Sequence, residues 1–266
     1  MQEVDREIAR AKLTLSLRVL GRRSDGYHTI ESEMVTLDLA DQLEFAQGTG
    51  LELVDEIEWI GARPVDLDAA IAPGRNLVES ALLLVRRDAR ICLKKRIPLG
   101  AGLGGGSADA AAVLRWAGES DVDKAARLGA DVPFCLAGGH ASVGGIGEIL
   151  EPLPMLDASF VLLVPAIGVS TAAVYAAFDE LGRTDAAESS NDLEKASLAV
   201  EPLLIRYRDL LHEVSSRRPQ LAGSGATWFV ECTPDEAIRV CEEARSAIVE
   251  AELTAAVCAT KTDAGG

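Results

Sequence analysis

The segment Pro98–Ser107, which reads PLGAGLGGGS and contains five glycines, constrains the fold of this chain more than any other feature. The residues before it predict a short strand over Ile91–Ile97, and the alanine-rich segment Ser107–Trp116 predicts a helix. Glycine has no side chain, so the backbone here can approach a partner closely. A loop between a strand and a helix N-terminus also brings backbone N–H groups together, and they can bind an anion. With Ser107 as the expected N-cap, we predict a phosphate-binding loop and not a flexible linker.

Two well-known phosphate-binding motifs fit this segment less well. A Walker A loop requires a lysine directly after the last glycine, and here a serine follows. Gly100, Gly102 and Gly105 match the G-x-G-x-x-G pattern of dinucleotide-binding domains. That pattern also requires an acidic residue at the end of the next strand, and the residues before Asp121 and Asp123 do not predict a strand. A dehydrogenase therefore stays an alternative, which a test of NAD binding decides.

Composition and charge limit the classes of partner. The chain has 266 residues, of which 48% are hydrophobic, enough for one large domain or two small ones with a buried core. Its net charge of −16 argues against a nucleic-acid partner, which requires a basic face. The most apolar stretch, Phe160–Val169, is too short to span a membrane and contains Pro165, and the N-terminus has no apolar signal region. We expect a cytoplasmic protein without a membrane partner.

The five cysteines and three histidines show no metal-binding spacing, so we expect reduced thiols and no resident metal site. Strands and helices alternate without a regular βα repeat, which favours an α+β fold. The segment Glu151–Pro154 predicts a boundary between domains at 1–152 and 153–266, with the glycine-rich loop in the first. Gly182–Ser190 predicts a mobile loop. Residue patterns predict strands over 11–19, 35–45, 159–164, 227–231 and 254–260, and helices over 76–87 (capped by Asn76), 170–181 (between Ser170 and Gly182) and from Thr233.

The segment Lys95–Ala110 as a whole resembles the phosphate-binding motif of the GHMP kinases, which phosphorylate small molecules with ATP. The resemblance implies a ribosomal S5 domain 2-like N-terminal domain and a ferredoxin-like C-terminal domain. Further segments are similar to one branch of this family, in the same order along the chain: Ala11–Leu13, Gly21–His28, Asn76–Val78, Leu128–Phe134, Val169–Thr171, Asn191–Glu194 and Gly223–Thr227.

That branch moves the γ-phosphoryl group of ATP onto the 2-hydroxyl of 4-diphosphocytidyl-2-C-methyl-D-erythritol, in the non-mevalonate isoprenoid pathway. The resemblance implies that Asp131 is the catalytic base and that Lys12 is the catalytic cation, with Mg²⁺ arriving with ATP. Without it, Asp131 reads as a turn or cap acid and Lys12 as a solvated strand lysine.

The resemblance also assigns binding residues. An aromatic ring stacks on a base, so Tyr27 and His28 are the expected cytosine contacts, and Tyr175 is either a second stacking wall or a core aromatic. Asn76 is expected near the nucleotide, with helix capping as the alternative. The phosphate-binding residues are expected to be Pro98, Gly100, Gly102, Leu103, Gly104, Gly105, Gly106, Ser107 and Asn76, and the substrate-binding residues Thr14, Tyr27, His28, Tyr175, Gly223, Ser224 and Gly225.

Two positions depart from the family pattern. The family usually carries asparagine where this chain has Thr14, and the segment Ala117–Arg127 is shorter than expected. Two further interpretations stay open for these reasons: a GHMP-type kinase with a different alcohol substrate, and a nucleotide-binding paralogue with weak activity. The oligomeric state, monomer or homodimer, is not predicted.

Overall fold

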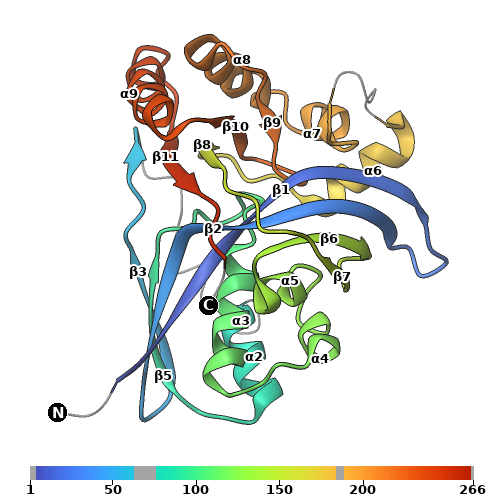
Figure 1. Ribbon diagram of the computed structural model, residues 1–266, viewed down its shortest axis with the longest axis vertical. Coiled ribbons are helices and arrows are strands. Elements are labelled where there is room, and N and C mark those ends of the chain that lie inside the picture. The colour runs from blue at the N-terminus through green and yellow to red at the C-terminus, as the bar shows by residue number, and fades with distance from the viewer. Residues whose placement is uncertain (1–3, 63–75, 184–188, 265–266) are drawn as a thin grey trace.

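The computed structural model describes residues 4–62, 76–183 and 189–264, and these form two β-sheets with helices packed outside them (Figure 1). The strand order in the first sheet is β3-β5-β2-β6-β7, with β1 paired to β2, and in the second it is β4-β11-β8-β10-β9. Only β3 and β5 run parallel, and the other paired strands are antiparallel. The α+β class predicted from the sequence is confirmed.

A long antiparallel hairpin dominates the first sheet. β1 (Asp5–Arg22) and β2 (His28–Ala46) are both longer than the strands predicted over 11–19 and 35–45. The far end of this hairpin, where Arg22 pairs with His28, projects past the other strands toward helix α6 (Figure 1). The remaining strands are β3 (Gly50–Asp55), β5 (Arg90–Lys95), β6 (His140–Gly145) and β7 (Ile149–Pro152).

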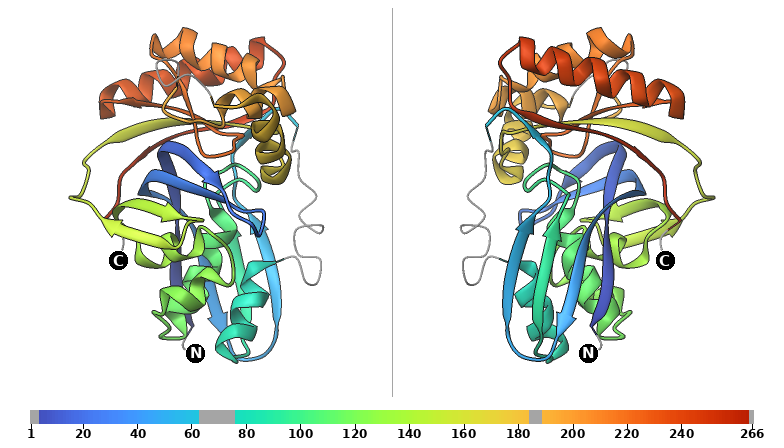
Figure 2. Two further views of the ribbon diagram at one scale, coloured as in Figure 1. Left: turned by 90° about the vertical axis from the view of Figure 1, so that its right-hand side faces the viewer. Right: turned by 90° about the vertical axis from the view of Figure 1, so that its left-hand side faces the viewer.

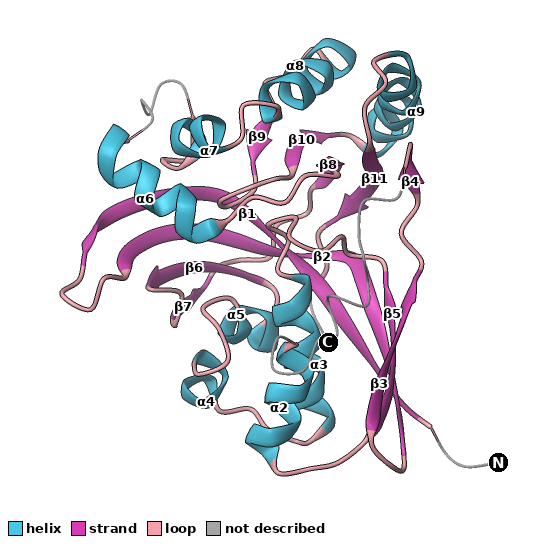
Figure 3. Cartoon of the chain, turned by 180° about the vertical axis from the view of Figure 1, so that it is seen from behind, coloured by secondary structure: helices cyan, strands magenta, loops and turns pink. Residues whose placement is uncertain are grey.

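Four helices lie together on one side of the first sheet (Figure 3). Alanine side chains of α3 pack against Leu43 and Leu93, because their small size lets the helix approach the sheet. Asn76 caps α2, as predicted, and its side chain accepts a hydrogen bond from the Val78 N–H at 2.9 Å. The prediction of Ser107 as the cap of α3 is wrong. The helices are α2 (Leu77–Val85), α3 (Gly105–Trp116), α4 (Val122–Ala126) and α5 (Val132–Ala137).

Gly104 is the N-cap of α3, with a φ of 69°. This left-handed conformation, which glycine adopts at little cost, starts the helix two residues before Ser107. Ser107 therefore lies inside the first turn of the helix.

The second sheet is built mainly from the C-terminal part of the chain. The predicted caps Ser170 and Thr233 are confirmed, and Thr233 forms a capping box with Glu236. The strands are β4 (Trp59–Ile60), β8 (Ser159–Pro165), β9 (Gln220–Leu221), β10 (Trp228–Cys232) and β11 (Ala255–Lys261). The helices are α6 (Thr171–Leu181), α7 (Glu194–Val200), α8 (Leu204–Ser215) and α9 (Pro234–Glu250).

The central strand β8 divides its side chains between two cores. Val161 and Leu163 pack under α8 and α9, whereas Phe160 and Leu162 face Leu13 and other residues of the first sheet. The second sheet is therefore apolar on both faces, as the continuous apolar run of β8 requires. In Figure 2, α8 and α9 form the outer layer at one end of the molecule, and the first sheet lies below the second.

The predicted boundary at residues 152 and 153 falls between β7 and β8. One strand from before that boundary, β4, pairs with β11 in the second sheet, so the division into two domains stays a prediction. Part of the predicted mobile loop, residues 184–188, lies outside the described residues. Within the described ranges no helix has both the length and the apolar character needed to cross a membrane.

Candidate active site

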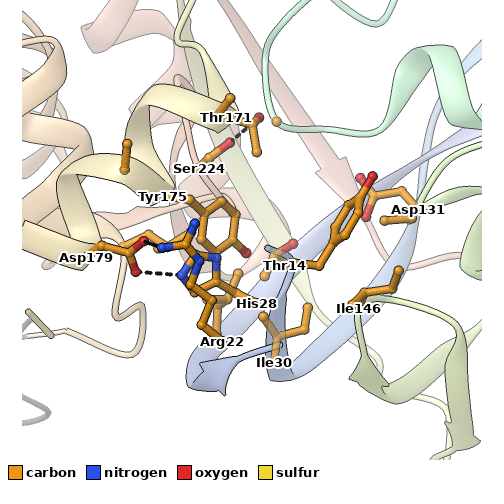
Figure 4. A pocket seen from close by; sticks show the side chains of 18 of the residues that line it. Thr14, Arg22, His28, Ile30, Asp131, Ile146, Thr171, Tyr175, Asp179 and Ser224 are labelled. Carbon is orange, nitrogen blue, oxygen red and sulfur yellow. Dashed lines mark hydrogen bonds and ion pairs between the residues drawn. The ribbon is translucent and has the colours of Figure 1, made fainter. Parts of the chain in front are cut away.

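A cavity of about 630 Å³ lies between the β1–β2 hairpin, α6 and two glycine-containing loops (Figure 4). The structure brings together nine of the predicted site residues on its wall, from parts of the chain far apart in sequence. They are Lys12, Thr14, Tyr27, His28, Gly102, Asp131, Tyr175, Gly223 and Ser224.

Lys12 and Asp131 face each other at one end of this cavity. The Lys12 Nζ lies 3.4 Å from Oδ2 of Asp131 and donates a hydrogen bond to the Thr14 hydroxyl at 3.1 Å. Lys12 is only 4% exposed, so its interpretation as a solvated strand lysine is wrong. Asp131 holds the N-cap position of α5 without making a side-chain capping bond, which leaves its carboxylate available to the cavity. We call this cluster of Lys12, Thr14 and Asp131 the reaction end.

The glycine-rich loop passes directly behind the reaction end. A Cβ on Gly104 would lie 2.8 Å from the Lys12 Cγ, and one on Gly102 would lie 2.6 Å from the Ala222 carbonyl oxygen. Both residues have left-handed φ angles, so neither space nor backbone conformation permits another side chain there. The Lys12 N–H donates to the Leu103 carbonyl at 3.0 Å, and this bond fixes the lysine against the loop.

The other predicted phosphate-binding residues do not line this cavity: Pro98, Gly100, Leu103, Gly104, Gly105, Gly106, Ser107 and Asn76. Most of them belong to the loop and to the first turn of α3, where the N–H groups have no acceptor inside the helix. These N–H groups and the positive end of the helix fit a phosphate chain. Among the predicted substrate residues, Gly225 also lies off the cavity wall and packs near Leu221.

A buried ion cluster supports the glycine-rich loop from below. Lys95 at the end of β5 donates to Asp41 and, at 2.6 Å, to Asp109 in α3. Asp41 also accepts the N–H groups of Arg96 and Ile97, where the chain enters the loop.

The charges of this cluster are coupled because all three side chains are buried. Burial alone lowers the pKa of Lys95, but the two carboxylates outweigh it and raise that pKa above its ordinary value. Burial raises the pKa of the Asp109 carboxyl to about 7, against the opposing effect of the Lys95 ammonium group. One lysine cannot fully compensate two buried carboxylates.

The loop that carries Gly223 and Ser224 is also held from behind. The buried Asn191 side chain donates to the carbonyls of Leu221 and Gly223 at 2.8 and 2.7 Å. The Ser224 hydroxyl lies 2.9 Å from that of Thr171 at the start of α6, and Figure 4 shows the pair at the edge of the cavity. These bonds fix the loop next to the reaction end.

The opposite end of the cavity consists of side chains from the hairpin tip and α6. The His28 and Tyr175 rings stack with centroids 4.8 Å apart, and the His28 Nε2 lies 2.7 Å from Asp179. Arg22 pairs with the second oxygen of Asp179 at 3.1 Å. Tyr27 directly precedes His28 at the tip of the hairpin, lines the cavity and is 61% exposed. We call the group of Arg22, Tyr27, His28, Tyr175 and Asp179 the base end. Figure 4 labels Arg22, His28, Tyr175 and Asp179 of this group.

Tyr175 lines the cavity and is therefore more than a core aromatic. Burial, together with the negative charge of Asp131, raises the pKa of its phenol to about 12. The hydroxyl therefore stays protonated and can donate a hydrogen bond inside the cavity.

Two functional features were missed in the sequence. Asp179 lies one helical turn after Tyr175, so the i, i+4 spacing on the predicted helix would have placed both on one face. The Asp41–Lys95–Asp109 cluster left a weaker signal, a single acid inside the alanine-rich helix α3.

Comparison with known proteins gives matches along almost the whole chain. Residues 76–139 match the family model described as the GHMP kinases N terminal domain. A Paracoccus denitrificans protein named 4-diphosphocytidyl-2-C-methyl-D-erythritol kinase is 40% identical over 250 residues, which cover 84% of this chain and 85% of that protein.

Solved structures agree with these matches. A crystal structure of a 4-(cytidine 5'-diphospho)-2C-methyl-D-erythritol kinase is 32% identical, has a TM-score of 0.74 and covers 97% of this chain and 100% of its own. The Methanococcus jannaschii mevalonate kinase is 13% identical with a TM-score of 0.58, covers 99% of each chain and shares the fold. The chain therefore belongs to the 4-diphosphocytidyl-2-C-methyl-D-erythritol kinase family, a branch of the GHMP kinases.

Proposed function

We propose that this protein transfers the γ-phosphoryl group of ATP to the 2-hydroxyl of 4-diphosphocytidyl-2-C-methyl-D-erythritol. The observation that carries the proposal is the reaction end, where the Asp131 carboxylate and the Lys12 ammonium group face one cavity with the glycine-rich loop directly behind them. The aromatic base end lines the same cavity, and this arrangement suits a substrate that carries a nucleobase at one extremity and a hydroxyl at the other. The names of the relatives point to the same substrate.

In this proposal Asp131 accepts the proton of the substrate hydroxyl and orients the oxygen for in-line attack. Lys12, 3.4 Å away, compensates the charge of Asp131 and the charge that develops on the transferred phosphoryl group. The Thr14 hydroxyl, which accepts from Lys12, keeps the ammonium group on the cavity wall. Phosphoryl transfer requires little beyond this positioning and charge stabilisation.

The glycine-rich loop and the first turn of α3 would hold the phosphates of ATP through backbone N–H groups. Within the described ranges, no three His, Cys, Asp or Glu side chains gather as a metal site. Mg²⁺ would therefore be held mainly by the phosphates, where it neutralises their charge. Asn76 caps α2, whose first residue Leu77 packs near Gly106 of the loop, and a role for Asn76 near the nucleotide is part of the proposal.

At the base end, Tyr27, His28 and Tyr175 would bind the cytosine by stacking and by hydrogen bonds to its polar edge. Gly223 and Ser224 would approach the phosphates or the sugar alcohol, with Gly225 shaping their loop. A net charge of −16 supports the absence of a nucleic-acid partner. The proposal also includes a cytoplasmic location and an enzyme that is either a monomer or a homodimer.

A coupled assay of ADP release tests the proposal with three alcohols: the cytidyl substrate, bare methylerythritol and mevalonate. Turnover of the cytidyl substrate alone is the expected result. Preference for another alcohol would support a GHMP-type kinase of different specificity, and nucleotide binding without turnover of any alcohol would support a non-catalytic paralogue.

A further inference from the structure

The carboxylate of Asp179 contacts two side chains, one through each of its oxygens. One oxygen of its carboxylate lies 2.7 Å from the His28 Nε2, and the other lies 3.1 Å from Arg22 Nη1. The sequence indicated no role for this residue, and nothing in the proposed phosphoryl transfer uses it. Figure 4 shows the three side chains in contact where α6 meets the hairpin.

The contact with Asp179 determines which nitrogen of His28 carries the proton. A carboxylate can only accept hydrogen bonds, so a neutral His28 must have its proton on Nε2. Nδ1 then has a lone pair, and among the described residues it has no hydrogen-bond partner. The ring is held in place by stacking on Tyr175, and its side chain is only 8% exposed. The cavity wall therefore presents a fixed acceptor.

An acceptor at this position distinguishes two kinds of pyrimidine. Cytosine presents an amino group that donates a hydrogen bond, where uracil presents a carbonyl oxygen that only accepts. A lone pair on Nδ1 accepts from the first and repels the second. We propose that Asp179 is a specificity-determining positioning residue, which keeps His28 in the Nε2–H form so that the base end selects an amino-pyrimidine over an oxo-pyrimidine.

Arg22 makes a sharp test possible. Its guanidinium group has donors only, so in an Asp179→Asn variant it takes the amide oxygen. The amide NH₂ group then faces His28 Nε2, which must accept, and the histidine proton moves to Nδ1. The base end of this variant would donate where the native one accepts. A change that leaves the size of the side chain unaltered would thus reverse the hydrogen-bond polarity of the pocket.

The first measurement is the tautomer itself. The chain has three histidines, so ¹⁵N-labelled histidine gives a simple NMR spectrum, in which a His28→Ala variant assigns the signal of His28. At pH 8 we expect the Nε2–H form in the native protein and the Nδ1–H form in Asp179→Asn. A native His28 with its proton on Nδ1, or on both nitrogens, would overturn the proposal.

The second measurement is selectivity. Calorimetric titration with CDP and UDP, followed by turnover of the cytidyl substrate and its uridyl analogue, should show a preference for cytidine that falls at least about tenfold in Asp179→Asn. The loss should appear in KM for the cytidyl substrate, with kcat and KM for ATP nearly unchanged. Glu180→Gln, an exposed neighbour on α6 with the same loss of charge, is the matched control and should retain the native preference. An unchanged ratio in Asp179→Asn contradicts the proposal.

This inference rests on the proposed function, yet the two can fail separately. A CDP preference that depends on Asp179, without turnover of the cytidyl substrate, would overturn the kinase assignment alone. Turnover of that substrate with a preference that Asp179→Asn leaves intact would overturn the role of Asp179 alone.

Discussion

The two ends of the cavity are built in different ways. At the reaction end, the backbone of the glycine-rich loop contacts Lys12 directly, and a fully buried ion cluster lies underneath. At the base end, side chains from a projecting hairpin meet one helix, and the contacts are partly exposed ion pairs and stacked rings. The proposed catalytic positions are therefore set by the core of the protein, whereas the proposed selection of substrate depends on a few surface side chains.

This difference has a physical consequence for mutation. A change at the reaction end disturbs buried charges, whose loss is costly because no water replaces the missing partner. A change at the base end exposes the remaining groups to solvent, which can satisfy them. We expect stability and kcat to respond at the first end, and substrate KM at the second.

The largest effect is expected for Lys95→Met. It leaves Asp41 and Asp109 buried without their cation and should lower the free energy of unfolding by about 3–5 kcal/mol. Lys94→Met is the matched control on the same strand, where the lysine pairs with the partly exposed Glu44 and should contribute at most about 1 kcal/mol. Urea titration of both variants compares them directly. A loss below about 1 kcal/mol in Lys95→Met would mean that the buried cluster does not support the loop.

The pH dependence of stability sharpens the same point. The folded pKa of Asp109 is about 7, against an ordinary value of 3.8, so between these values the folded protein holds a proton that the unfolded chain has lost. Its contribution to stability is therefore greatest below about pH 4 and is lost as the pH rises toward 7. Asp109→Asn keeps an acceptor for Lys95 and should remove this component. The free energy of unfolding of the native protein minus that of Asp109→Asn, measured by urea titration, should therefore fall as the pH rises from about 4 to about 7. A difference that stays constant over this range would contradict the raised pKa of Asp109.

Substitution within the reaction end should abolish most of the turnover. Lys12→Met and Asp131→Asn are each expected to lower kcat at least about a hundredfold, because each removes a charged group used in phosphoryl transfer. Nucleotide affinity, measured by equilibrium binding of ATP, should change little. Arg6→Met on the same strand and Asp123→Asn in α4 are exposed controls that should retain native turnover. Near-native kcat in Lys12→Met or Asp131→Asn removes that residue from the mechanism.

At the base end, Tyr27→Ala should raise KM for the cytidyl substrate about tenfold, since base–aromatic stacking contributes roughly 1–3 kcal/mol. KM for ATP should stay nearly constant, and Tyr27→Phe, which keeps the ring, should resemble the native enzyme. Steady-state kinetics with each substrate varied in turn separates the two constants. Equal increases in both KM values would show that the two ends are not independent.

The smallest effect is expected for Thr14→Asn. The amide restores the group that the family resemblance leads us to expect. It can still accept from Lys12 and can add a hydrogen bond to substrate worth about 0.5–1.5 kcal/mol. Substrate KM should fall accordingly, with kcat unchanged. Thr14→Val, which has the same shape and no hydroxyl, should reduce kcat through the loss of the Lys12 contact. Abolished activity in Thr14→Asn would show that the reaction end is built around the hydroxyl.

The sequence predicted the reaction end better than its surroundings. Lys12 and Asp131 belong to local motifs, and their meeting in one cavity follows from the family resemblance. The helix starts at Ser170 and Thr233 were predicted correctly, because a cap acts on residues that follow it directly. Ser107 failed as a cap because the left-handed Gly104 ends the loop earlier, and local propensity could not show which glycine would do so.

The parts that sequence could not predict depend on contacts across the chain. Asp179 is 151 residues from His28 in the sequence, and the two side chains meet only because α6 packs against the hairpin. Lys95 becomes buried only after β2 and α3 close over it, since a lysine in a strand is otherwise a surface residue.

The short strand β4 has a consequence for the order of assembly. Trp59 and Ile60 leave the first sheet and pair with Ala256 and Ala255 at the edge of the second, before the chain returns to α2. Residues 153–266 by themselves would expose that edge of β11, with unpaired backbone groups ready to pair with another chain. The C-terminal part of the chain thus depends on a strand that is synthesised before it. The second sheet is completed by an earlier segment of the chain and is not formed from residues 153–266 alone.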